Sequence, residues 1–183
     1  MSLTSEKHRS ELERFGESLS QEAYQVHLVP AAGNVPFDTL LVKLELFEKE
    51  NRVFWLELSY LPGLEDDLGD VSILQCYVAL SEHTSEENRA GLERLIVKIN
   101  AKLPIGGFGL LGNPKLLFFK HNSMLPNDNH VASFQIVHEI VAMTSYLTGV
   151  FSEPLIKLAT GEKTAEEAMS DMPFRDVIGS SSA

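Results

Sequence analysis

The chain has 183 residues, 44% of them hydrophobic and 22% charged, which is typical of one globular domain and not of a disordered or membrane-embedded chain. Its 26 acidic and 15 basic residues give a net charge of −11, which argues against nucleic acids and membranes as partners. A single cysteine excludes an intramolecular disulfide, and the N-terminus lacks the apolar stretch of a signal peptide. We therefore expect one cytoplasmic domain over residues 1–183.

The first half of the chain predicts one helix followed by four strands. Leu12, Phe15 and Leu19 recur at spacings of three and four, which predicts a helix over residues 4–19. The apolar period then changes to two, which predicts half-buried strands. These strands cover residues 24–28, 42–46, 53–60 and 71–80. In the third strand, Trp55 and Glu57 fall on the face opposite to Phe54 and Leu56.

The second half begins with a helix signal. Thr84 and Glu87 have the spacing of a capping box, and apolar residues follow at helical intervals as far as Leu103, where Pro104 closes the helix. Residues 106–111 and 115–120 are predicted to form a hairpin, because the turn-forming residues at 112–114 lie between them.

The most apolar helix is predicted over residues 134–151, where two adjacent apolar stripes give a broad buried surface. Its polar residues Gln135, His138 and Glu139 argue against a membrane span. We expect it to be covered on both sides, by its own sheet and by something else. Short helices over 154–159 and 164–169 follow, and residues 174–183 are expected to be a disordered tail.

Together these elements predict an α+β fold in the order α-β-β-β-β-α-β-β-α-α. The expected sheet is antiparallel, with about five to six strands, and is flanked by helices.

Metal and cofactor motifs are incomplete. His138 and Glu139 begin like a zinc-protease helix, but Ala142 stands where the second histidine is required. The acidic loop at 65–70 lacks the ligand spacing of a calcium-binding loop, and the glycines at 106–109 precede a strand and not a phosphate-binding helix. We expect neither a metal nor a cofactor.

One catalytic alternative remains. His121 or His130, with Ser123 and Asp128, offers the residue types of a hydrolase triad within one loop region. That reading requires the side chains to converge in a pocket, whereas turn-forming loops commonly contain the same residue types.

Two stretches resemble a known family. They are LPIGGFGL at residues 103–110 and PKLLFFKHNSMLP at residues 114–126, followed by the apolar helix. The pattern is similar to that of the YbjN-like family, whose members share the fold of type III secretion chaperones. The resemblance implies a protein-binding or regulatory role, usually as a dimer, without known catalytic residues.

The functional prediction is a non-enzymatic protein-binding module, chaperone-like or a regulatory adaptor, that forms a homodimer and binds another protein. Trp55, Phe108, Phe134 and Met143 are the predicted contact residues, because aromatic and Met side chains dominate interface cores. An ordinary core position is the alternative for each of them. A small hydrolase and a structural subunit of a larger assembly are the alternative functions.

Overall fold

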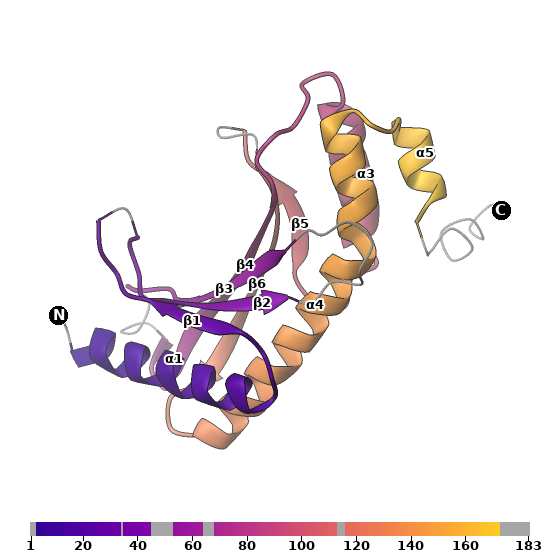
Figure 1. Cartoon of the computed structure of the whole chain (residues 1–183). Coiled ribbons are helices and arrows are strands. Elements are labelled where there is room, and N and C mark those ends of the chain that lie inside the picture. Colours follow the sequence, from indigo (N-terminus) through magenta and orange to yellow (C-terminus); the bar gives the residue numbers. More distant parts are fainter. Residues whose placement is uncertain (1–2, 34, 45–52, 64–67, 113–115, 173–183) are drawn as a thin grey trace. The chain divides into compact units, whose positions relative to one another are not determined.

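The computed structural model describes residues 3–33, 35–44, 53–63, 68–112 and 116–172. They form an α+β fold with a six-stranded antiparallel sheet in the strand order β1-β2-β3-β4-β6-β5 (Figure 1). The chain divides into two compact units, Met1–Val78 with His121–Ser145, and Ala79–Lys120 with Tyr146–Ala183. We call them unit 1 and unit 2. That the whole chain acts as one domain stays a prediction, and the tail at 174–183 lies outside the described residues.

The predicted order of helices and strands is confirmed. The helices and strands are α1 (Leu3–Gln21), β1 (Val26–Val29), β2 (Thr39–Leu44), β3 (Phe54–Tyr60), β4 (Val71–Ser81), α3 (Arg89–Asn100), β5 (Gly107–Leu110), β6 (Leu117–Pro126), α4 (His130–Thr160) and α5 (Ala165–Ser170).

In unit 1 the alternating strands present one buried face. It comprises Leu40, Val42 and Leu44 of β2, Phe54, Leu56, Leu58 and Tyr60 of β3, and Ser72, Leu74, Cys76 and Val78 of β4. Helix α1 lies along this face (Figure 1), and a methyl group added at Gly16 would lie 3.1 Å from the Leu40 side chain. The glycine therefore permits the close approach of the helix to the sheet.

Helix α1 packs beside the first half of α4, and the two helices run in the same direction. The Phe15 and Phe134 rings meet edge to face with their centroids 5.2 Å apart. One turn further along, His138 contacts Ser18 through Nε2 at 3.0 Å and Glu22 through Nδ1 at 3.0 Å. Part of the cover expected over the apolar helix is thus supplied by α1 of the same chain.

In unit 2 the side chain of Asn100 holds the start of β5 against the end of α3. Its Nδ2 donates to the Phe108 carbonyl at 2.8 Å, and its Oδ1 accepts from the Phe108 amide at 2.9 Å. In the hairpin, Gly109 stands opposite Phe118. A methyl group at Gly109 would lie 2.4 Å from the Phe118 ring, so the ring occupies the space that a side chain would need.

The predicted capping box at Thr84 is wrong. Helix α3 begins at Arg89, and its N-cap residue Asn88 makes no side-chain capping hydrogen bond. The Ser85 amide instead donates to the Ala159 carbonyl at 2.8 Å, so a tertiary contact within unit 2 takes the amide of the residue after Thr84. A complete capping box occurs at α5, between Thr164 and Glu167.

The predicted break near residue 152 is also wrong, because α4 continues through Pro154 as one helix to Thr160. A proline inside a helix removes one backbone hydrogen bond and crowds the preceding turn. Leu155, Ile156, Leu158 and Ala159 are nevertheless all buried, and this burial offsets the cost. Among the described residues, no helix is long and apolar enough to cross a membrane.

Candidate functional site

The second face of the unit 1 sheet is only half-buried, and we call it the open face. Ser59 of β3 belongs to this face and is buried. The other side chains that alternate with the buried set include Leu41 and Lys43 of β2, Trp55 and Glu57 of β3, and Ile73, Gln75 and Tyr77 of β4. Each of these side chains is partly accessible to solvent. Two aromatic rings and two aliphatic side chains therefore share an accessible surface, in contrast to the fully buried face under α1.

The strand register places Glu57 at the centre of this face. Leu41 is its partner on β2, and Tyr77 is its partner on β4. On β1, His27 extends the same row beyond Leu41. Directly paired side chains on one face of a sheet lie in contact range, so Glu57 is flanked by an aliphatic and an aromatic side chain.

Trp55 lies in the next row of the open face, paired with Lys43. Its ring is 5.5 Å from the His27 ring, at a tilt of 43°. The tryptophan thus borders the row that contains Glu57, and its ring is held by a contact with the edge strand.

Partial burial changes the pKa values of Glu57 and Tyr77 in this row. Loss of solvent raises the pKa of Glu57 above its ordinary value. Burial also raises the pKa of Tyr77, and the nearby Glu57 carboxylate adds to that effect. Within the described parts of the chain, no hydrogen bond or ion pair is formed by the Glu57 carboxylate. This carboxylate is therefore partly desolvated without a compensating charge.

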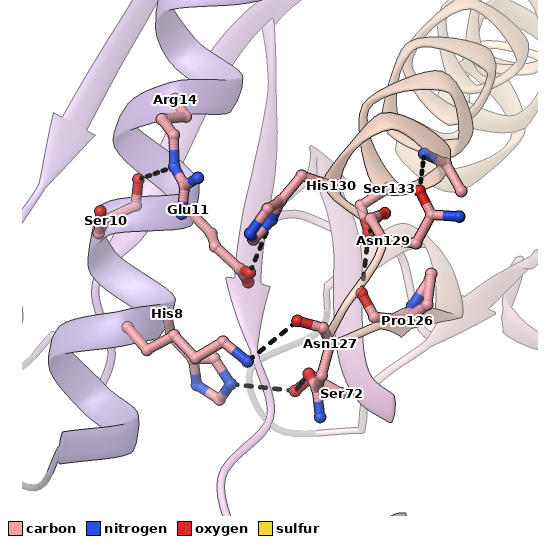
Figure 2. Close-up of polar contacts among 12 residues, drawn as sticks. His8, Ser10, Glu11, Arg14, Ser72, Pro126, Asn127, Asn129, His130 and Ser133 are labelled. Atoms are coloured by element: carbon pink, nitrogen blue, oxygen red, sulfur yellow. Dashed lines mark hydrogen bonds and ion pairs between the residues drawn. The ribbon is translucent and has the colours of Figure 1, made fainter. Parts of the chain in front are cut away.

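A polar cluster joins α1 to the buried face of the same unit and to the start of α4. Figure 2 shows its contacts between Glu11 and His130 and between His8 and Ser72. Tyr60 Oη donates a hydrogen bond to Glu11 Oε2 at 2.8 Å, and His130 Nδ1 lies 3.6 Å from Glu11 Oε1. Burial, with the Glu11 carboxylate second, raises the pKa of Tyr60. The phenol therefore stays protonated and acts as a donor to the buried carboxylate.

The His8 ring stacks on the Tyr60 ring, with the centroids 4.1 Å apart. Its Nε2 lies 3.2 Å from Ser72 Oγ, and Ser72 Oγ donates to Asn127 Oδ1 at 2.7 Å. Because the serine proton is used in that bond, His8 Nε2 must carry a proton and donate it. Asn127 in turn donates to the Gly69 carbonyl at 3.2 Å. The cluster is thus a chain of contacts that joins α1 to β3, to β4 and to the loops at Gly69 and Asn127, which favours a structural role.

The four predicted contact residues lie in different surroundings. Trp55 is on the open face. Phe108 is 3% exposed, and its ring meets Phe119 at 5.2 Å in the core of unit 2. Phe134 packs on Phe15, and Met143 is partly exposed on α4. Of the four, Trp55 combines accessibility with neighbours suited to binding.

The residues of the hydrolase alternative lie within unit 1. His121 and Ser123 are on β6, Asp128 is in the following turn, and His130 starts α4 beside Glu11. In the described residues, no hydrogen bond joins His121, Ser123 and Asp128. Burial lowers the pKa of His121. His121, Ser123 and Asp128 are thus residue types of a catalytic triad, but within the described residues they lack the hydrogen bonds that would link them into one.

Metal and thiol chemistry find no support in the described parts of the chain. No group of three or more His, Cys, Asp or Glu side chains there is placed to hold a metal ion. His138, which begins the zinc-like motif, is bound to Ser18 and Glu22. Part of the acidic loop, residues 65–67, lies outside the described residues. Burial raises the pKa of Cys76 to about 12, so the thiol stays protonated.

Sequence reasoning placed Trp55 and Glu57 on one strand face but did not select Leu41, Glu57 or Tyr77 as site residues. The available signal was a charged residue two positions after a tryptophan on the outer face of an alternating strand. Its meaning depends on the pairing with β2 and β4, which the local pattern does not give.

No protein-family model matches the chain, and no match was found among curated proteins. The resemblance to the YbjN-like family and to the chaperone fold therefore stays a prediction.

Proposed function

We propose that this chain is a non-enzymatic protein-binding module that holds a segment of another protein against the open face. The observation that supports the proposal is the partial exposure of Leu41, Trp55 and Tyr77 together on the sheet face opposite to α1. Aromatic side chains are enriched in interface cores, because they bury a large area at a small cost in side-chain entropy.

A groove on the other side of the sheet is the competing surface. It has a volume of about 570 Å³, an apolar floor and acidic side chains at its rim. The residues that line it include Glu13, Gly16, Glu17, Val26, Leu28 and Leu40. Because aromatic anchors are absent from this lining, whereas the open face has two, the open face is the better candidate.

A chaperone-like or adaptor role agrees with this surface. The acidic composition keeps the rest of the surface soluble and self-repelling, while the half-buried open face, with its aromatic and aliphatic side chains, takes the partner. A cytoplasmic location and a homodimer belong to the same proposal, and light scattering on the purified chain measures the second of these.

Site-directed photocrosslinking tests the proposal. A photoreactive benzoyl-phenylalanine is placed at Leu41 or at Tyr77, and the full-length chain is irradiated in an extract of its source cells. We expect a discrete adduct at both positions, and mass spectrometry then identifies the attached peptide. An adduct of two copies of this chain would instead assign the open face to a homodimer.

The matched control places the same probe at Val97 of α3, an apolar residue that is 68% exposed in unit 2. Equal, diffuse labelling at Leu41, Tyr77 and Val97 would show that the open face has no dedicated partner, and the proposal would fail.

A further inference from the structure

We infer that the segment bound by the open face carries a cationic side chain, an arginine in preference to a lysine, that pairs with Glu57 between Leu41 and Tyr77. The inference rests on the function proposed above and adds the chemical class of the partner. It commits to an extended, apolar and basic protein segment.

The first support is the position of Glu57. Central strand positions of half-buried faces favour β-branched and aromatic residues, and a carboxylate there is partly desolvated. Burial raises its pKa, and the described residues supply neither a hydrogen bond nor an ion pair to it. A cation brought by a ligand would restore the interaction that solvent no longer supplies in full.

The second support is that Lys43, the cationic side chain on the same face, does not pair with Glu57 in the part of the chain that the structure describes. Lys43 is on the same face and is paired with Trp55, the residue two positions before Glu57. Such a diagonal neighbour lies within reach of a long side chain, yet no ion pair joins Lys43 to Glu57 among the described residues. The carboxylate is therefore available to an external cation.

The third support is the pair of aromatic side chains beside Glu57. Tyr77 stands next to Glu57 in the row, and Trp55 borders that row. A planar guanidinium can pair with a carboxylate and stack on an aromatic ring at once, whereas an ammonium acts as a point charge. The net charge of −11 also attracts a basic segment over a longer range. The central position of Glu57, its lack of an ion pair among the described residues and its aromatic neighbours thus all favour an arginine in the bound segment.

The chain carries its own reporter for this surface, because Trp55 is its single tryptophan. Its fluorescence is titrated in the full-length chain with two pools of acetylated, amidated pentapeptides. Both pools have serine at positions two and four, and Leu, Val, Phe or Tyr at positions one and five. The central residue is arginine in one pool and citrulline, its uncharged counterpart, in the other. In an extended peptide, positions one, three and five share a side.

We expect the arginine pool to shift the Trp55 emission with an affinity roughly tenfold or more above that of the citrulline pool. The Glu57→Gln variant should lose this preference and bind both pools alike. Glu17→Gln, which changes an exposed carboxylate on α1, should keep it. Raising the salt concentration should weaken the arginine pool more than the citrulline pool.

Equal binding of the two pools by the wild-type chain would overturn the inference and leave the protein-binding proposal standing. A response to neither pool, together with discrete crosslinks at Leu41 and Tyr77, would also overturn it, since the partner would then use other chemistry. Failure of both the peptides and the crosslinks would reject the proposed function itself.

Discussion

Tyr60 on β3 donates a 2.8 Å hydrogen bond to the Glu11 carboxylate on α1, and both residues are 5% exposed. A buried acceptor that loses its donor keeps the cost of desolvation. We therefore expect Tyr60→Phe to lower the free energy of unfolding by about 1.5–3 kcal/mol, as measured by urea denaturation.

A double-mutant cycle identifies the source of that loss. In a Glu11→Leu background the hydrogen bond is already absent, so Tyr60→Phe should cost much less there than in the wild-type chain. An equal cost in both backgrounds would assign the effect to packing with His8 and not to the hydrogen bond.

A methyl group at Gly109 should displace the Phe118 ring and destabilise the hairpin. The added carbon would lie 2.4 Å from Cζ of Phe118, so the ring would have to leave its position over the glycine. We expect Gly109→Ala to destabilise the chain by about 1–3 kcal/mol in thermal or urea unfolding. Gly112→Ala is the control, because the nearest atom to its added carbon, on Arg89, is 3.9 Å away. Similar losses in the two variants would contradict the ring contact as the cause.

Glu57 should reduce stability at neutral pH. Because the pKa of Glu57 is raised in the folded state, the stability that its protonation supplies is fully present below pH 4.5, its ordinary pKa, and is lost as the pH rises through the raised value. Glu57→Gln should therefore be more stable than the wild-type chain at pH 7 and lose that advantage below pH 4.5. Urea denaturation at the two pH values measures this difference. A variant less stable than the wild type at neutral pH would indicate that the carboxylate has a stabilising partner.

We expect His121 to lower the free energy of unfolding as the pH becomes acidic. Burial lowers the pKa of this imidazole below its ordinary 6.5, so the unfolded chain takes up the proton first. The stability that the neutral His121 imidazole contributes is fully present above pH 6.5 and is lost as the pH falls through its folded-state pKa. We expect His121→Gln to lose less stability than the wild-type chain between about pH 7.5 and 5. An NMR titration in which His121 takes up its proton above pH 6.5 would contradict the lowered pKa.

Some of this architecture could be predicted from local patterns. The period of two predicted the alternating burial of β2 and of Phe54–Leu58 in β3 correctly, because side-chain direction in a strand depends only on the parity of the residue. Helical spacing likewise identified the buried stripe of α1, with Leu12, Phe15 and Leu19 at or below 2% exposure.

Local signals failed where a tertiary contact competed with them. The capping spacing at Thr84 matched that at Thr164, yet only the second forms a capping box. Separate helices were predicted over 134–151 and 154–159, but α4 continues through Pro154 to Thr160, and the residues after the proline are buried. In both cases a non-local contact, which no short window contains, outweighs a local preference of about 1–3 kcal/mol.

By itself, the sequence determined the α+β class, the order of helices and strands and the acidic charge, since periodicity and composition are local or additive properties. Only the tertiary structure decided which sheet face α1 covers and which stays half-open. It also decided that Glu57 lies between Leu41 and Tyr77, through a register that joins strands distant in the chain. A binding face depends on such pairings, because a side chain acquires its accessibility and charged neighbours only when the strands are assembled.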